Sequence, residues 1–211
     1  LNERRQKMKV IKPCFIIEDV VDGEKIIKNI EKYGRTCYKS EKETTKESAS
    51  KFIQKYVIGL GHETIIEHEK VTVRIICDRG VTHEIVRHRL ASYSQESTRY
   101  CNYSNKKFGG EITFIQPDFE LSQEDKDVLA VLEKHYLFRL KQGLSPQQAR
   151  YFLPNGLKTE IVMTMNLREW RHFFRLRCSP KAHPQMREIT IPLLEEFRKL
   201  IPVVFDDINV E

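Results

Sequence analysis

Apolar residues recur along this chain with two periods, one typical of helices and the other typical of strands. Where they fall three or four positions apart they share one face of a helix. We expect helices over residues 23–33, 47–60, 81–90, 122–141, 166–176 and 184–200. Shorter alternating or β-branched segments predict strands at 10–17, 71–77, 112–115 and 159–165.

Residues that start or interrupt elements refine these boundaries. Pro13 cannot donate to a sheet, so the first strand is expected at a sheet edge. Asp78 or Thr82 can cap the helix at 81–90, and Ser122 can cap the long helix that follows it. Ser145, followed by a proline, begins one further helix.

The order of these elements predicts a mixed α/β (α+β) protein with a central sheet flanked by helices. A chain of 211 residues can bury one substantial core, so we expect a single domain over 1–211, with 1–7 as a tag or disordered. A Rossmann fold is not expected, because the pair Gly59 and Gly61 follows a helix and lacks the third glycine of the phosphate-binding turn.

Composition narrows the classes of partner and compartment. The net charge of +6 favours anionic ligands, but no block of lysine or arginine resembles a nucleic-acid-binding arm. No apolar run approaches the roughly 18 residues of a membrane span, and the first residues are too polar for a signal peptide. Five cysteines without a close pair indicate a reduced, cytoplasmic protein.

The histidines do not have the spacing of a zinc site. A zincin helix presents two histidines at positions i and i+4, which places both on one face. His62 and His68 are six positions apart, and His83 and His88 are five apart. We therefore expect no metal.

The segment 87–100 is the strongest candidate for a ligand site. It contains Arg87, His88, Arg89 and Arg99 together with several hydroxyl groups. A guanidinium is a permanent cation whose planar fork grips phosphate or carboxylate, so the segment suits a phosphorylated ligand. A solvated basic turn is the simpler alternative.

Glu84, Arg87 and His88 would share one face of the helix expected at 81–90, because they are three or four positions apart. The acid would then orient the arginine and the imidazole toward a ligand. A surface ion pair worth a few tenths of a kcal/mol explains the same spacing.

Three later residues, Arg150, His172 and Arg177, are open to two interpretations each, whereas Asn166 has one. Arg150 has apolar neighbours and either snorkels or is held at a pocket wall. Asn166 is an expected helix N-cap, and His172 is a packing or surface residue or a ligand contact. Arg177 ends a half-buried helix, where it either stabilises the helix dipole or points into a site.

Taken together, these motifs resemble the flavin-dependent thymidylate synthases, the ThyX family, in order and approximate spacing over most of residues 10–200. The matching residues are Gly61-His62-Glu63-Thr64, Glu67-His68, Arg87-His88-Arg89 with Ser97 and Arg99, Ala149-Arg150, Leu153-Pro154, Asn166-Leu167-Arg168, His172 and Leu176-Arg177.

The resemblance implies a set of site residues. Those implied to bind FAD are Thr64, Arg87, His88, Arg89, Gln95, Asn166, Leu167, Arg168 and His172. Those implied to bind the substrate dUMP are Glu84, Ile85, Val86, Arg87, Gln95, Glu96, Ser97, Thr98, Arg99, Arg150 and Arg177. Arg177 matches the catalytic arginine that favours ionisation of the uracil ring at N3.

The resemblance also implies the reaction and the assembly. NADPH would reduce FAD, methylenetetrahydrofolate would supply the carbon, and dUMP would become dTMP, with tetrahydrofolate and oxidised NADP released. The family fold is an α/β domain unlike Rossmann, and four identical subunits share their active sites.

Two departures from the family pattern keep an alternative open. Many members have glutamine where Glu84 stands, and a carboxylate cannot donate a hydrogen bond unless it is protonated. The loop at 178–182 is longer than in some members. A flavin-binding or nucleotide-binding relative without synthase activity is therefore the alternative, whereas a nucleic-acid-binding module has no stacking motif to support it.

Overall fold

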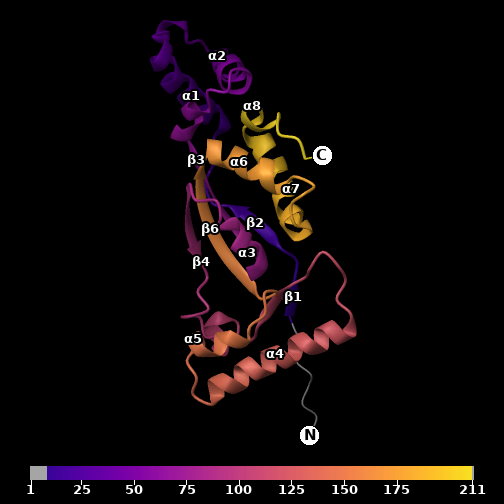
Figure 1. Cartoon of the computed structure of the whole chain (residues 1–211). Coiled ribbons are helices and arrows are strands. Elements are labelled where there is room, and N and C mark those ends of the chain that lie inside the picture. The colour runs from indigo at the N-terminus through magenta and orange to yellow at the C-terminus, as the bar shows by residue number, and fades with distance from the viewer. Residues whose placement is uncertain (1–8, 211) are drawn as a thin grey trace. The chain divides into compact units, whose positions relative to one another are not determined.

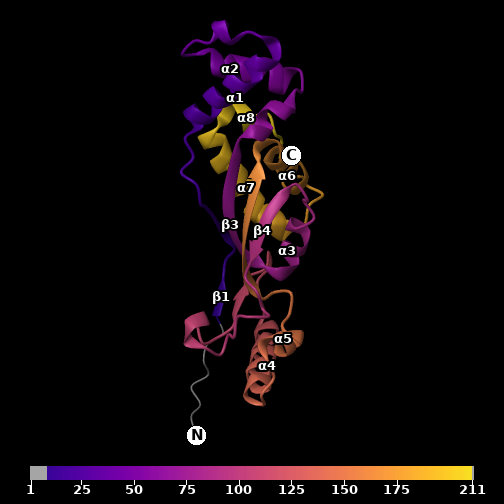
Figure 2. The ribbon, with the colours of Figure 1, turned by 90° about the vertical axis from the view of Figure 1, so that its left-hand side faces the viewer.

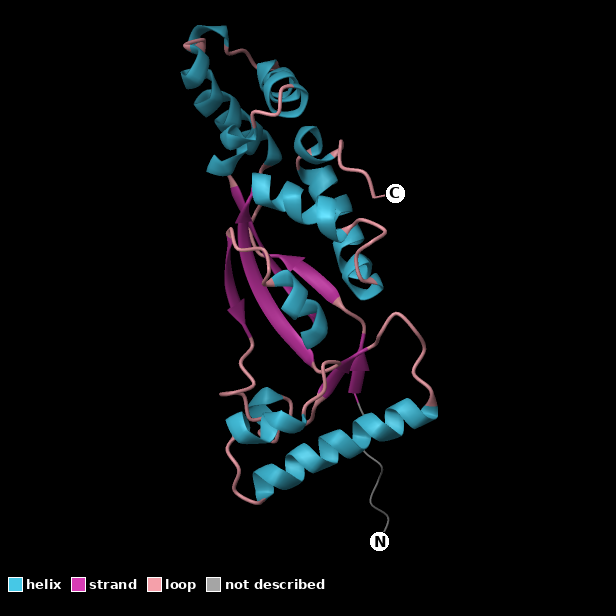
Figure 3. Cartoon of the chain, viewed as in Figure 1, coloured by secondary structure: helices cyan, strands magenta, loops and turns pink. Residues whose placement is uncertain are grey.

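The computed structural model describes residues 9–210 and shows a mixed α/β fold, as the sequence predicted (Figure 1, Figure 3). The α-helices are α1 Gly23–Tyr38, α2 Ser48–Phe52, α3 Arg79–Ile85, α4 Gln123–Lys141, α5 Pro146–Ala149, α6 Leu167–Arg177, α7 Pro184–Leu200 and α8 Pro202–Phe205. Short 3-10 helices are η1 Glu41–Glu43, η3 Glu63–His68, η4 Lys106–Phe108 and η5 Arg150–Phe152, and η2 Ile53–Gly59 is a π-helix.

The strands form two sheets. They are β1 Lys9–Ile11, β2 Cys14–Ile17, β3 Lys70–Asp78, β4 Ala91–Gln95, β5 Thr113–Ile115 and β6 Lys158–Asn166. β1 pairs in parallel with β5, and the four-stranded sheet has the order β2-β3-β6-β4. Along β3 and β6 buried residues alternate with more exposed ones, because successive side chains of a strand point to opposite faces.

The described residues group into two compact units. Unit 1 comprises residues 9–14, 75–87 and 94–161, and unit 2 comprises 15–74, 88–93 and 162–210. β3 and β6 contribute residues to both units. The single domain expected over 1–211 stays a prediction. The expectation for residues 1–7 lies outside the described residues.

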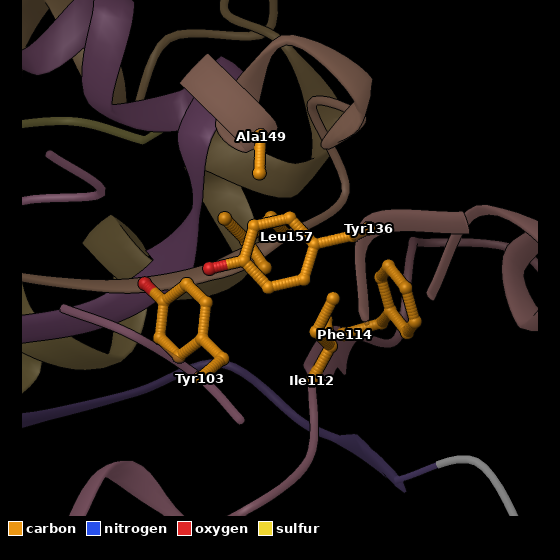
Figure 4. Close-up of a cluster of buried hydrophobic side chains, with 6 residues drawn as sticks. All are labelled: Tyr103, Ile112, Phe114, Tyr136, Ala149 and Leu157. Carbon is orange, nitrogen blue, oxygen red and sulfur yellow. The ribbon is translucent and has the colours of Figure 1, made fainter. Parts of the chain in front are cut away.

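The core of unit 1 lies between α4 and the segments that pack on it. Figure 4 shows its buried side chains, which are Tyr103, Ile112, Phe114, Tyr136, Ala149 and Leu157. α4 and α5 lie side by side in both ribbon views (Figure 1, Figure 2). Ser122 caps α4 in a reciprocal arrangement with Asp125, as expected from the sequence, which fixes where this helix begins.

The core of unit 2 is an aromatic cluster shared by α6, α7 and α8. Its rings are those of Trp170, Phe173, Phe174, Phe197 and Phe205, all at most 1% exposed. The indole nitrogen of Trp170 donates to the carbonyl of Val71 in β3 at 3.0 Å. α6 is thereby held against the sheet, and the positions of its remaining side chains are fixed with it.

Four sequence expectations needed correction. The helix expected at 81–90 ends at Ile85, so Glu84, Arg87 and His88 do not share a helical face. His88 is instead buried among residues of unit 2, a tertiary contact that local spacing does not encode. The residues that follow, for which no strand was expected, form strand β4.

The other two corrections concern helix geometry and the first strand. The helix expected at 47–60 is α-helical only over α2 and continues as the π-helix η2. The strand expected at 10–17 is divided at Lys12 and Pro13 into β1 and β2, and β2 lies at the edge of its sheet, as Pro13 indicated.

Candidate active site

His88 is the centre of a buried polar group in unit 2. His88 is 5% exposed, and the ring of Phe173 packs edge-on against its imidazole with the ring centroids 4.9 Å apart. The hydroxyl of Tyr93 donates to the His88 carbonyl at 2.6 Å. Packing and this hydrogen bond therefore fix both the ring and the backbone.

Both imidazole nitrogens of His88 have a partner. Nδ1 lies 3.2 Å from Oε1 of Glu169, and Nε of Arg177 donates to Nε2 at 3.1 Å. A guanidinium N–H can only donate, so Nε2 must accept and the proton of a neutral ring must lie on Nδ1. The hydrogen bonds thus select one tautomer, in which Nδ1 donates to Glu169.

The electrostatics agree with a neutral ring. Burial lowers the pKa of His88 below its usual value, and the positive charge of Arg177 acts in the same direction. The hydrogen bond to Glu169 opposes this lowering without reversing it. Burial also raises the pKa of Tyr93 to about 12, so this hydroxyl stays protonated and can donate.

Helix α6 supplies the partners of His88 through its periodicity. Glu169, Phe173 and Arg177 are four residues apart and therefore lie on one face. The side chain of Asn166 caps the helix by accepting from the Glu169 amide at 2.8 Å, as the sequence predicted. The last residue is held as well, because Thr190 donates its hydroxyl to the Arg177 carbonyl at 2.9 Å.

The other expected flavin residues of unit 2 have varied settings. The ring of His172 is exposed and lies edge-on to that of His88 with the centroids 5.7 Å apart. Arg168 is exposed and pairs with Glu67 at 2.5 Å. Thr64 and Arg89 are exposed, whereas Leu167 is fully buried, so a ligand contact by Leu167 would use its backbone.

A second group of expected residues lies in unit 1 around a pocket of about 310 Å³ lined by Arg79, Thr98, Arg150, Tyr151 and Leu153. Nη1 of Arg150 lies 3.5 Å from the Thr98 hydroxyl, to which it can donate. Two guanidinium groups and a hydroxyl at one pocket suit a phosphate. The pocket brings together two residues that the sequence assigned to the nucleotide.

Three of these lining residues were missed by the sequence analysis. Arg79 is the first residue of α3 and follows the capping residue Asp78. Its position in a turn between a strand and a helix was the available signal, because such turns carry many ligand contacts. Tyr151 gave no separate signal, and Leu153 belonged to a motif that matched the family but was not expected to bind a ligand.

Other residues of unit 1 that were expected to bind the nucleotide form hydrogen bonds within the protein. Gln95 donates to the hydroxyls of Thr82 at 3.0 Å and Thr159 at 3.4 Å. The carboxylate of Glu96 accepts from Tyr103 at 2.7 Å and from Lys158 at 3.0 Å. These hydrogen bonds fix the segment that follows β4.

The other residues expected to bind the nucleotide differ in exposure. Ile85 is fully buried, so only its backbone is available to a ligand, and Val86 is 42% exposed. Arg87 is exposed, and Glu84 and Ser97 are partly buried. Arg99 is exposed, with its Nε donating to Gln147 at 2.9 Å.

The ligand atoms of His88, Glu169 and His172 lie within 4.8 Å of one another, a separation that a metal ion could bridge. The guanidinium of Arg177 donates to Nε2 of His88, so its positive charge lies beside this group. A cation there would meet that positive charge directly. The geometry therefore favours a hydrogen-bonded group over a metal site.

Comparison with known proteins places the chain in a family. The family model described as thymidylate synthase complementing protein matches residues 19–203. A flavin-dependent thymidylate synthase of Mycobacterium avium is 31% identical over 202 residues, which cover 86% of this chain and 79% of that protein. The chain belongs to the flavin-dependent thymidylate synthase family, as its motifs indicated.

Other relatives extend this comparison. A flavin-dependent thymidylate synthase of Pyrococcus abyssi is 42% identical over 149 residues, which cover 68% of this chain. The chain spans 60% of the length of that relative and of its Pyrococcus and Thermococcus counterparts.

Two solved structures share the fold. Thymidylate synthase X from Helicobacter pylori, solved with FAD and dUMP, superposes with a TM-score of 0.76 at 20% identity and covers 92% of this chain and 98% of its own. The UMP/dUMP methylase PolB of Streptomyces cacaoi, bound with 5-Br UMP, gives a TM-score of 0.73 at 18% identity, with 95% of each chain covered.

No helix in residues 9–210 is both long enough and apolar enough to cross a membrane.

Proposed function

We propose that this protein is a flavin-dependent thymidylate synthase that converts dUMP into dTMP by reductive methylation. The observation that carries the proposal is Arg177, whose guanidinium is held by a buried, neutral His88 within a chain that matches the family over residues 19–203. NADPH, methylenetetrahydrofolate and FAD are the co-substrates and cofactor that this reaction requires.

The phosphate of dUMP is assigned to the pocket of unit 1. Arg150 and Thr98 line it, Arg79 adds a second guanidinium, and Arg99 follows Thr98 directly. The dUMP-binding segments are 84–87 and 95–99, together with Arg150 and Arg177. A charged hydrogen bond contributes about 1.5–3 kcal/mol, so two guanidinium groups supply a large part of nucleotide affinity.

Arg177 is assigned to the uracil ring. A fixed guanidinium beside the ring stabilises the negative charge that develops when N3 ionises and C5 becomes nucleophilic. His88 holds Nε of this guanidinium, so the group is oriented before the substrate binds. Orientation in advance is what makes such a donor effective in the transition state.

The residues present fit a flavin dinucleotide. In unit 2, Arg89 and Arg168 offer exposed positive charge for a diphosphate, and His172 offers an exposed ring beside His88. The assigned set is completed by Thr64, Arg87, His88, Gln95, Asn166 and Leu167. FAD, when bound, supplies the hydride chemistry, while the side chains bind and orient.

We also propose a homotetramer with shared active sites, located in the cytoplasm. α4 carries the exposed apolar residues Val128, Val131 and Phe138, which a subunit contact could cover. All five cysteines are free, which suits a reducing compartment.

An absorbance spectrum of the purified protein tests the proposal. Flavin bands that bleach when NADPH is added anaerobically, and recover with dTMP formation when dUMP and methylenetetrahydrofolate follow, would support it. A flavin that bleaches without any dTMP forming would favour the alternative, a flavin-binding relative without synthase activity, and would direct attention to Glu84. Absence of flavin uptake from excess FAD would refute both.

A further inference from the structure

We propose that Glu169 is a positioning residue that acts through His88 to orient the guanidinium of Arg177. Glu169 accepts the Nδ1 proton of His88, which leaves Nε2 unprotonated and able to accept from Arg177. This inference rests on the proposed function only for the kinetic consequence, because the hydrogen-bond arrangement can be tested in the protein alone.

The two possible tautomers of His88 are not equivalent in this setting. With the proton on Nδ1, both contacts, at 3.2 Å to Glu169 and 3.1 Å from Arg177, are hydrogen bonds. With the proton on Nε2, two N–H groups would face each other at the Arg177 contact, and Nδ1 would face a carboxylate oxygen without a proton between them. Glu169 is the group that decides between these two states.

The burial of Glu169 and His88 strengthens the preference for the Nδ1 tautomer. Glu169 is 7% exposed and His88 is 5% exposed, so water competes poorly for either group. Glu169 lies two helical turns before Arg177 on the same face of α6. The helix therefore fixes the distance between the carboxylate and the guanidinium, and the imidazole fits between them.

Holding Nε also directs the rest of the guanidinium. The group is planar, so a hydrogen bond at Nε limits its rotation and sets the direction in which the Nη hydrogens point. A misplacement of about 1 Å in a catalytic group can cost about 10²-fold in rate. Loss of the Glu169 carboxylate should thus slow turnover through its effect on His88 and Arg177.

The pH dependence has a defined sign. Charged and titratable groups facing His88 are Glu169, His172 and Arg177 from α6 and Tyr93 from β4. Glu169 is the acidic residue of this set, and its carboxylate raises the pKa of His88, whereas burial and Arg177 lower it. Removing its charge should lower that pKa further, so the acid limb of activity should move to lower pH.

The test uses the chain of 211 residues and its variants Glu169→Gln and Glu169→Ala. Long-range ¹H–¹⁵N spectra report which nitrogen of each histidine carries the proton, and the loss of one signal set in His88→Gln assigns His88. We expect wild type and Glu169→Gln to keep the proton on Nδ1, because an amide oxygen still accepts, and Glu169→Ala to show both tautomers.

Kinetics separate positioning from simple loss of stability. We expect Glu169→Ala to lower kcat about 10–100-fold with a smaller change in KM for dUMP, and Glu169→Gln to restore part of kcat with an acid limb at lower pH. Glu196→Ala removes an exposed carboxylate of unit 2 that pairs with Lys199, and it should change neither readout.

Several results would overturn the inference. One is a wild-type His88 that carries its proton on Nε2. Another is a folded Glu169→Ala variant with wild-type tautomer and kcat. A protein that makes no dTMP at all, but shows the Nδ1 tautomer and its loss in Glu169→Ala, would refute the proposed function while leaving the positioning role in place.

Discussion

The arginines of the unit 1 pocket give the sharpest prediction for substrate binding. Arg150 and Arg79 line the same pocket of about 310 Å³ with the hydroxyl-bearing Thr98. If the nucleotide phosphate binds there, Arg150→Ala should weaken dUMP binding by about 1.5–3 kcal/mol, the contribution of a charged hydrogen bond. That range corresponds to about 10–150-fold in Kd. Arg79→Ala should act in the same direction.

Isothermal titration with two ligands isolates the phosphate. Deoxyuridine has the same base and sugar as dUMP but no charge, so Arg150→Ala should barely change its affinity. Lys126→Ala, which removes an exposed positive charge from α4 in the same unit, serves as the matched control and should leave both affinities unchanged. An equal loss for dUMP and deoxyuridine, or no loss for dUMP, would refute the assignment of this pocket to the phosphate.

Three further predictions concern Arg177, which is proposed to be catalytic, the core of unit 1 and an ion pair of unit 2. Arg177→Ala should lower kcat about 10²–10³-fold in a thymidylate assay, and wild-type turnover in a folded variant would contradict its role. Phe114→Ala should reduce the free energy of unfolding by about 3–5 kcal/mol in urea titrations, because Phe114 is fully buried. A loss below about 1 kcal/mol would contradict this prediction and show that the core tolerates a cavity. Burial alone would raise the pKa of Asp207, but the two hydrogen bonds from Arg171, at 2.6 and 2.7 Å, lower it below its usual value of 3.8. Its contribution is therefore present above that value and lost as pH falls through the lower folded pKa. The stability difference between wild type and Asp207→Asn should shrink in acid, and a difference independent of pH would contradict the pairing.

Much of the secondary structure could be predicted because it depends on local signals. The helix at 184–200 matches α7, and Ser122 and Asn166 cap α4 and α6 as expected. Side-chain oxygens at these positions satisfy backbone amides within three residues, so no tertiary information is needed.

The errors arose where tertiary contacts decide the conformation. A helical pattern continued through Arg87 and His88, but the burial of His88 beside Glu169, 81 positions away, is incompatible with a helix to residue 90. Period alone also could not distinguish the π-helix η2 from an α-helix.

In the candidate site, too, the sequence indicated residues but not the tertiary contacts between them. Motif order located His88 and Arg177, but nothing in local sequence indicated that a hydrogen bond joins them. Glu169 reads as an ordinary first-turn acid of a helix, and only the fold reveals that its carboxylate meets a buried imidazole.

The central claim is that this protein methylates dUMP reductively, and the most direct test is a product analysis of one anaerobic reaction. Purified protein with FAD, NADPH, dUMP and methylenetetrahydrofolate should form dTMP, tetrahydrofolate and oxidised NADP in equal amounts, and Arg177→Ala should form almost none. Oxidation of NADPH with bound flavin but without dTMP would contradict the account.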